Sequence, residues 1–322
     1  MTFTLGVHLG QQNASMDELR SLWRRFDEGG LDWISVWDHL YEAPPQGGTT
    51  PHFEAVASLT ALAMETTRAR IGCLMFCVPY RNPALLAKAA VAVDHVSGGR
   101  LEMGLGAGWH APEFRAHGYE FGSWGDRFGQ LEDGLEIMTR MWSLGDGPDG
   151  PERATYAGEH FHVDDVSCVP GPLRGRIPVW VGGRGPKRTP RIAARYADGY
   201  NVPYVSPETY RELSENIDRA CDAIDRDPAQ IERTVNLSFN LVTDAASAER
   251  EAKRFAAMTA DEHAVYEASA LMGSPDDALE RLAQYRAAGA TGVNIALRLP
   301  VDDDALSLYL EQVVPAARAE FG

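Results

Sequence analysis

Residues 177–201 read IPVWVGGRGPKRTPRIAARYADGYN, and this stretch decides how the rest of the chain is interpreted. It begins with Ile177–Val181, an apolar run rich in β-branched residues that is typical of a strand buried on both faces. Glycines follow, and Thr189-Pro190 then offers a capping hydroxyl and a proline suited to a first helical turn. We therefore predict a buried strand, a tight loop and a helix that begins near Thr189.

The loop between this strand and helix has the features of an anion site. Its three glycines lack the Cβ that keeps a ligand away from the backbone, and a helix start presents free N–H groups and a positive dipole end. Neither a G-x-G-x-x-G spacing nor a Walker loop is present, so an ordinary strand-to-helix connection is the alternative. The glycines are Gly182, Gly183 and Gly185.

A cluster of cations at the same loop strengthens the anion interpretation. The chain carries 46 acidic against 30 basic residues, so local basic clusters stand out. Several cations near one helix start add to its field and suit a multiply charged anion. A solvated helix face would have the same composition and is the alternative. The cations are Arg184, Lys187, Arg188 and Arg191.

The composition of the whole chain limits its partners. A net charge of −16 argues against nucleic acid or an anionic membrane, because either requires an extended basic surface. The four cysteines form no CxxC pair, and neither a signal peptide nor a membrane-spanning run is evident. We therefore expect a cytoplasmic protein with buried thiols and a small-molecule substrate, and a homodimer is the assembly to test.

Short apolar runs alternate with helical patterns along the 322 residues. Strands are expected at residues 4–10, 33–37, 71–78, 101–105, 177–181, 199–202, 235–242 and 292–297. Helices are expected at 16–28, 53–67, 84–95, 127–142, 207–224 and 303–320, with further starts near Thr189 and Ser274. This order predicts an α/β fold of residues 1–322, a (β/α)8 TIM barrel, with a doubly wound open sheet as the alternative.

The regular alternation breaks after the fourth strand. We predict an insertion of about residues 111–175 that contains the helix at 127–142 and a small hairpin at 156–162. A second, shorter stretch at 256–272 has no clear pattern and is expected to be irregular. The insertion is expected to lie over one end of the barrel.

Polar and aromatic residues gather where the predicted strands end, which is where barrel enzymes place their active sites. Asp38-His39 follows the second strand directly, and a histidine beside a carboxylate can transfer protons near neutral pH. The alternative is that Asp38 caps the next segment and His39 is merely packed. The other residues at predicted strand ends are His8, Cys77, Gly106, His110, Asn201, Asn240 and Arg298.

The fourth strand runs into Gly104-Leu-Gly-Ala-Gly-Trp-His110, which permits close backbone approach to a flat ligand, with Trp109 able to stack on it. A strand-end turn plugged by an aromatic residue is the alternative. The many histidines suggest a metal hydrolase, but the one His-x-His pair, His160 and His162, lies in the predicted hairpin. We therefore expect no catalytic metal.

Six motifs follow one another along nearly the full length of the chain. They are SVWDHL at 35–40, PYRNPALLAK at 79–88, SGGRL at 97–101 leading into 104–109, VGG at 181–183, RYADGYN at 195–201 and GSPD at 273–276. Taken together and in this order, they resemble the bacterial luciferase-like monooxygenase superfamily, and within it the oxidoreductases that use the deazaflavin coenzyme F420.

The resemblance implies a (β/α)8 barrel with an insertion after the fourth strand, and a non-proline cis peptide that would here be Leu74–Met75. It also implies which residues contact the cofactor. They are Asp38, His39, Leu74, Met75, Gly106, Ala107, Gly108, Trp109, His110, Gly182, Gly183, Arg184, Gly185, Lys187 and Arg188.

One departure limits the substrate. The sugar-phosphate dehydrogenases of this group carry a glutamate proton donor after the fourth-strand glycines, and Trp109 occupies that place here. The basic residues that hold the substrate phosphate in those enzymes have no clear counterpart either. The resemblance therefore does not carry a sugar-phosphate substrate over to this chain.

We expect an oxidoreductase that transfers a hydride between coenzyme F420 and an unidentified organic substrate. His39 is the first candidate for proton handling, His110 the second, and Asp38 their acidic neighbour. The four cations near Gly185 suit F420, which carries an anionic oligoglutamate tail, better than they suit FMN, which ends at its phosphate. The alternatives are an FMN-dependent monooxygenase and a barrel that binds flavin without catalysis.

Overall fold

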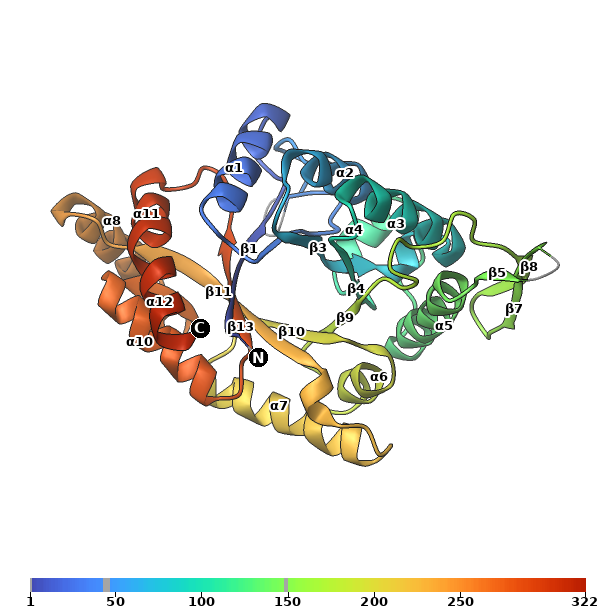
Figure 1. Cartoon of the computed structure of the whole chain (residues 1–322). Helices are drawn as coiled ribbons and strands as arrows, with labels where there is room; N and C mark the ends of the chain where they lie inside the picture. Colours follow the sequence, from blue (N-terminus) through green and yellow to red (C-terminus); the bar gives the residue numbers. More distant parts are fainter. Residues whose placement is uncertain (1, 43–46, 148–149) are drawn as a thin grey trace.

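Eight parallel strands close into a barrel in the computed structural model, which describes residues 2–42, 47–147 and 150–322 (Figure 1). The closure runs through the pairing of β1 with β13 and of β10 with β11. A continuous ring of paired strands rules out the doubly wound open sheet and confirms the TIM barrel. The strands are β1 (Thr4–Leu9), β2 (Trp33–Val36), β3 (Arg70–Cys77), β4 (Leu101–Gly106), β9 (Val179–Gly182), β10 (Gly199–Pro203), β11 (Glu232–Leu241) and β13 (Gly292–Leu297).

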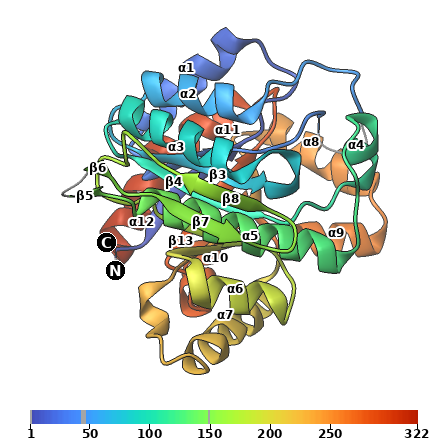
Figure 2. The same ribbon diagram turned by 90° about the vertical axis from the view of Figure 1, so that its right-hand side faces the viewer.

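Helices surround this ring, as Figures 1 and 2 show. Two of the predicted helix starts carry full capping boxes, at Ser15 with Glu18 and at Ser274 with Asp277. The helices of the ring are α1 (Met16–Glu28), α2 (Ala55–Glu65), α3 (Pro83–Ser97), α5 (Trp124–Trp142), α6 (Arg188–Tyr196), α7 (Pro207–Asp222), α10 (Pro275–Ala287) and α11 (Asp303–Leu308), the last continuing through a π-helical turn (Tyr309–Val313) into α12 (Val314–Phe321).

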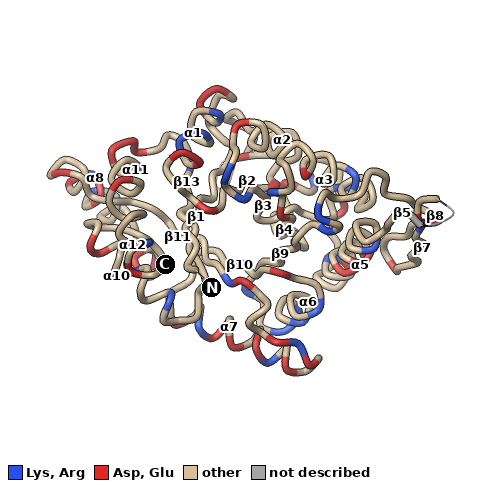
Figure 3. Tube along the Cα trace, viewed as in Figure 1, with Lys and Arg blue, Asp and Glu red and all other residues tan. Residues whose placement is uncertain are grey.

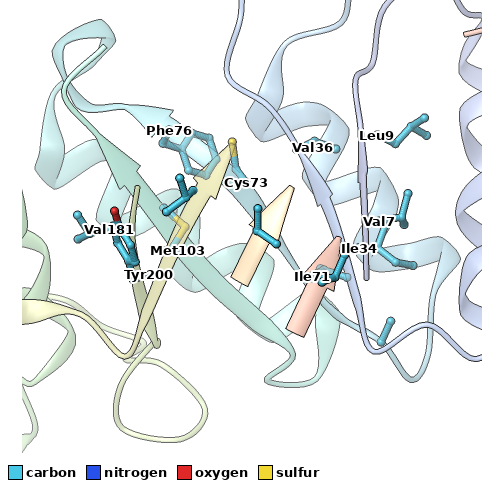
Figure 4. Packing of buried hydrophobic residues seen from close by; sticks show 14 of the residues in the cluster. Val7, Leu9, Ile34, Val36, Ile71, Cys73, Phe76, Met103, Val181 and Tyr200 are labelled. Atoms are coloured by element: carbon cyan, nitrogen blue, oxygen red, sulfur yellow. The ribbon is translucent and has the colours of Figure 1, made fainter. Parts of the chain in front are cut away.

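The hydrophobic core lies between the barrel and its helices. Alternate residues of each strand, such as Val7, Ile34 and Ile71, belong to one buried cluster, part of which Figure 4 shows from close by. The side chains of the opposite parity fill the barrel, and many are polar. The Asn201 amide donates to Thr234 and to Asn236, each at 2.9 Å, and Asn294 donates to the same Asn236 oxygen at 3.0 Å. These bonds satisfy amides that would otherwise be costly to bury.

The segment between β4 and β9 corrects one expectation. Helix α5, which the sequence placed in an insertion, packs beside α3 and α6 and is itself a member of the helix ring. What is added to the ring is the short helix α4 (Ala111–Ala116) and two hairpins, β5 (Asp146–Gly147) with β6 (Gly150–Pro151) and β7 (Ala154–Ala157) with β8 (His162–Val166). The second hairpin is the one expected at 156–162, and it lies along α5 (Figure 2).

Two further differences concern the later half. The stretch expected to be irregular contains α9 (Ala260–Ala268), which begins at a Thr259 capping box, and follows α8 (Ala245–Ala256). It ends in a ninth strand, β12 (Ala270–Gly273), which pairs with the carboxyl end of β11 outside the ring. Within the described residues, no helix is both long and apolar enough to cross a membrane.

Candidate functional site

The carboxyl ends of the barrel strands bring the predicted site residues to one mouth. The chain leaves β2 at Val36 and places Trp37 and His39 there, and it leaves β4 at Gly106 and places Trp109 and His110 there. The His39 ring centroid lies 5.7 Å from that of Trp109 and 6.5 Å from that of His110. Residues from two strand ends that are about 70 positions apart in the sequence are therefore neighbours.

Asp38 does not form the expected pair with His39. Its carboxylate is fully buried and accepts two bonds from the Arg81 guanidinium, at 2.6 and 2.8 Å, and one from the Cys77 N–H at 2.8 Å. Burial raises the pKa of Asp38, while Arg81 and the Cys77 N–H oppose that rise. With these contacts, Asp38 ties the end of β2 to the end of β3.

The carboxylate partner of His39 is Glu113 of α4, a residue that the sequence analysis missed. Glu113 Oε2 lies 2.9 Å from His39 Nδ1 and accepts from the Tyr80 hydroxyl at 2.7 Å. Burial alone would raise the pKa of Glu113, but the bonds from His39 and Tyr80 and the charge of His39 outweigh it and lower this pKa to about 2. The signal in the sequence was an Ala-Pro-Glu helix start, Ala111 to Glu113, shortly after the glycines that end the fourth strand.

Aromatic rings and neutral histidines surround His39. The Trp37 ring lies 5.5 Å from it, and Trp37 Nε1 donates to His52 Nε2 at 2.9 Å. Burial, followed by the charge of His39, lowers the pKa of His52 to about 4. Burial, followed by Arg298 and His39, lowers the pKa of His8 to about 3, and His8 Nδ1 bonds Ser35 Oγ at 2.9 Å. Both histidines are therefore neutral near pH 7, whereas His39 has an ionised partner.

The remaining predicted residues at strand ends have separate surroundings. Arg298 lies over the Trp37 ring, 5.5 Å from its centroid. Cys77 is a buried thiol whose pKa burial raises well above its usual range. Asn201 belongs to the amide network inside the barrel, and Asn240 donates to Glu251 at 2.7 Å. Of these four residues, only Arg298 contacts the aromatic cluster around His39.

Met75 occupies part of the space that the sequence assigned to a flat ligand. The Leu74–Met75 peptide bond is cis, as the family resemblance implied. A Cβ on Gly182 or Gly104 would lie 2.6 Å from the Met75 side chain, so these glycines make room for that side chain. Leu74 packs with the buried Trp33 and Trp180 inside the barrel.

The glycine turn after β4 is also needed for close packing against neighbouring side chains. Gly108 has a φ of +73°, and a Cβ there would lie 2.7 Å from both Cys77 Sγ and Phe114. The turn leaves Trp109 on the surface, where 59% of the residue is exposed. An exposed tryptophan beside His39 is available to stack on a ligand.

The glycine loop after β9 keeps the features of an anion site. Helix α6 begins at Arg188, one residue before the expected start, and its N-cap Lys187 makes no side-chain capping bond. Thr189 therefore does not cap the helix. Its hydroxyl lies 3.0 Å from where a Cβ of Gly185 would be and 3.4 Å from that of Gly183, whose φ is +140°. Thr189 is 2% exposed, and none of the hydrogen bonds among the described residues uses its hydroxyl.

The four cations of this loop differ in their contacts. Arg184 donates to the carbonyls of Pro203 and Tyr204, and Arg188 donates to the Trp124 carbonyl at 3.3 Å. Within the described part of the chain, Lys187 and Arg191 have no carboxylate partner. Arg188 and Arg191 line a cleft of about 500 Å³ between α5, α6 and residues 159–160, and Figure 3 shows the basic residues along α6.

These features fit the phosphate of a flavin-like cofactor. Helix N–H groups without a side-chain cap, glycines without a Cβ and a nearby Thr189 hydroxyl that makes no hydrogen bond among the described residues are features that suit a phosphate. Lys187 precedes the helix as a further cation, whereas the cleft that Arg188 and Arg191 line also carries Asp126, Glu132 and Glu159 and so has mixed charge. The geometry thus places an uncapped helix start after one strand end and a histidine–carboxylate pair after another.

Comparisons with known proteins find relatives along nearly the whole chain. A family model described as luciferase-like monooxygenase matches residues 1–258. The chain is 27% identical to an F420-dependent glucose-6-phosphate dehydrogenase of Rhodococcus erythropolis over 344 aligned residues, covering 98% of each chain.

Solved structures share the fold. An F420-dependent secondary alcohol dehydrogenase in complex with an F420-acetone adduct has a TM-score of 0.82 at 17% identity, covering 98% of this chain and 99% of that one. The oxygenating constituent of 3,6-diketocamphane monooxygenase from Pseudomonas putida, in complex with FMN, has a TM-score of 0.76 at 18% identity, covering 98% and 99%. At these identities the likeness shows the barrel and its helices and does not distinguish the two cofactors.

Proposed function

The chain belongs to the luciferase-like monooxygenase family, and from this premise we propose that it is an oxidoreductase that uses coenzyme F420. The reaction would transfer a hydride between the deazaflavin and an organic substrate. Similarity over 98% of the length to an F420-dependent dehydrogenase supports the cofactor. The single observation that carries the proposal is the start of α6, where an uncapped helix, the Thr189 hydroxyl and two cations without a carboxylate partner among the described residues adjoin one glycine loop.

The residues of this loop suit a cofactor with a long anionic tail. The Gly183–Gly185 backbone and the Thr189 hydroxyl would hold the phosphate. Lys187 and Arg191 have no carboxylate partner in the described structure and would attract charges beyond the phosphate. Coenzyme F420 supplies hydride chemistry through its deazaflavin ring and carries an oligoglutamate tail, whereas FMN ends at the phosphate.

His39 would handle the proton that accompanies the hydride. Its side chain is 16% exposed at the mouth and carries an ionised partner, Glu113, on Nδ1. When an alcohol carbon of the substrate loses a hydride, Nε2 would accept the hydroxyl proton, and in the reverse direction it would return that proton. His110, 6.5 Å away between ring centroids, is the second candidate. Asp38, held by Arg81, would contribute by fixing the segment that carries His39.

A titration tests the cofactor. F420 with its tail, its tail-less precursor and FMN would be titrated by fluorescence at low and at high salt. Each exposed cation near the tail should contribute about 0.5–1 kcal/mol, weakened by salt. We therefore expect tailed F420 to bind most tightly, with an advantage that shrinks as salt rises.

Charge-neutral variants assign that advantage to the loop. Replacing Lys187 and Arg191 with glutamine should remove part of the tail's contribution and leave FMN almost unaffected. Arg211→Gln combined with Arg219→Gln, at two exposed cations of α7, is the control with the same change in net charge. If FMN bound best and the double variant changed no affinity, FMN-dependent monooxygenation would replace this proposal. If a cofactor bound but no substrate were turned over with either one, the barrel would be a flavin-binding protein without catalysis.

A homodimer would bury the outer face of α2 and α3. Apolar residues are exposed on both of these adjacent helices, namely Met64 (74% exposed) and Ala57 on α2, and Leu85 (65% exposed) and Ala92 on α3. Lys88 folds away to bond the Val169 carbonyl, at 2.7 Å. A second copy of the chain is the proposed occupant.

Light scattering tests this assembly. Leu85→Glu should give a monomer, whereas Ile224→Glu, at an exposed apolar residue elsewhere, should not change the mass. A monomeric wild type would contradict the dimer. The four free, buried thiols accord with the reducing cytoplasm that we propose as the location.

A further inference from the structure

We propose that Glu113 is the positioning residue for His39, because it fixes the imidazole in the form that carries its proton on Nδ1 and leaves Nε2 for the substrate proton. This inference rests on the proposed function for the identity of the reaction. The tautomer itself is a property of the protein without cofactor or substrate, so it can be tested separately.

Glu113 is one of the best-satisfied carboxylates at the mouth. Only 1% of its side chain is exposed. Oε1 accepts from the Leu40 N–H at 2.6 Å and from the Tyr41 N–H at 3.0 Å, while Oε2 accepts from Tyr80 at 2.7 Å and contacts His39 Nδ1 at 2.9 Å. The first two bonds hold the segment after His39, and the last one holds its ring. Glu113 therefore holds both the segment that follows His39 and the imidazole ring itself.

The chemistry of these groups leaves one arrangement of protons. A carboxylate with a pKa near 2 is ionised at neutral pH and can only accept hydrogen bonds. A contact of 2.9 Å between it and Nδ1 then requires that Nδ1 donate. In a neutral imidazole the other nitrogen, Nε2, must be the acceptor. When Nε2 takes up a proton, the adjacent negative charge stabilises the resulting cation.

The other titratable groups around this pair are already assigned partners or are neutral. Tyr80 donates to the same Glu113 oxygen. His52 accepts from Trp37 Nε1, and His8 bonds Ser35 Oγ. Cys77 is a buried thiol, and the His110 ring lies beyond the His39 ring at 6.5 Å between centroids. Among these described groups, only Glu113 fixes the ring of His39 by a direct hydrogen bond.

Glu113→Gln is the informative substitution. The amide oxygen can still accept from the Leu40 and Tyr41 N–H groups, so the segment stays anchored. The amide NH₂ would then face Nδ1 and can only donate, which forces Nδ1 to become the acceptor and moves the proton to Nε2. A base with its lone pair on the wrong nitrogen loses its function, so we expect turnover to fall by at least about 100-fold.

Two measurements test the proposal. Nitrogen-15 NMR of histidine-labelled protein without cofactor should show His39, identified by its loss in His39→Ala, with Nδ1–H in the wild type and Nε2–H in Glu113→Gln. Tyr80→Phe, which removes another donor from the same oxygen, should keep the Nδ1–H form. A double-mutant cycle should show that Glu113→Gln costs little further turnover when His39 is already alanine.

The outcomes separate the two proposals. An Nε2–H form in the wild type overturns the positioning role, and so does an equal loss of turnover from Glu113→Gln with and without His39. If Glu113→Gln did not fold, the wild-type spectrum would still decide between the two forms. Absence of turnover with either cofactor would defeat the proposed function while leaving the tautomer assignment intact.

Discussion

Asp38 and Arg81 form a buried pair whose removal should be measurable as a loss of stability. Asp38 is 0% exposed and Arg81 16% exposed in their side chains, and Asp38→Ala would delete three hydrogen bonds at once, two from the guanidinium and one from the Cys77 N–H. Among the described residues, Arg81 would keep one carboxylate partner, Glu54, at 3.1 Å and 45% exposed, and its contact with the Phe76 ring. The variant therefore leaves a mostly buried cation without its main partner.

The magnitude follows from these contacts. Breaking a buried pair by removing one partner costs about 3–5 kcal/mol, because the other charge stays desolvated. Replacing both, as Asp38→Leu with Arg81→Met, removes the unpaired charge and leaves only the Cys77 N–H without an acceptor, at about 1–3 kcal/mol. We therefore expect the double variant to be more stable than Asp38→Ala, although it carries more substitutions.

Urea unfolding followed by tryptophan fluorescence and circular dichroism measures both free energies. Coincident transitions from the two probes would justify the comparison. Asp38→Ala with wild-type stability would refute the architectural role and return Asp38 to the candidates for proton transfer. Equal instability of the single and the double variant would refute the argument from the unpaired charge.

Three further predictions concern the mouth and its acid sensitivity. Gly183→Val should weaken cofactor binding strongly and leave the circular dichroism spectrum unchanged. Gly183 has a φ of +140° and lies beside the Thr189 hydroxyl, so a branched side chain there would enter the proposed phosphate site. Unaltered cofactor affinity would show that this loop is not part of the site. His39→Ala should lower turnover at saturating cofactor by about 100-fold or more and change cofactor affinity much less, as steady-state kinetics and titration would show. The pKa values of His8 (about 3) and His52 (about 4) in the folded state lie below the ordinary 6.5. The unfolded chain therefore takes up protons on these residues first as the pH falls. Their full contribution to stability is present above about pH 6.5 and is lost as the pH falls toward 4. Each should subtract about 1.4 kcal/mol per pH unit from the free energy of unfolding in that window, and His52→Gln should reduce the slope.

The sequence by itself determined the barrel and the location of its mouth. Alternating apolar runs and helical patterns specify strands and helices through local periodicity. The order of these strands and helices along the chain is then compatible with few topologies. The predicted strand at 177–181 and the glycine loop after it were found within two residues of their predicted places. These features depend on neighbours in the chain, which a sequence displays directly.

The partners of the charged side chains were decided only by the tertiary structure. Asp38 adjoins His39 in the sequence, yet it bonds Arg81, while His39 bonds Glu113, 74 residues later. Arg184 was grouped with the other loop cations, yet it bonds the carbonyls of Pro203 and Tyr204. A side chain's hydrogen-bond partner is set by the three-dimensional positions of groups on different strands and helices, at a precision of tenths of an ångström. Local periodicity specifies which face a residue occupies, and only the closed barrel brings those faces together.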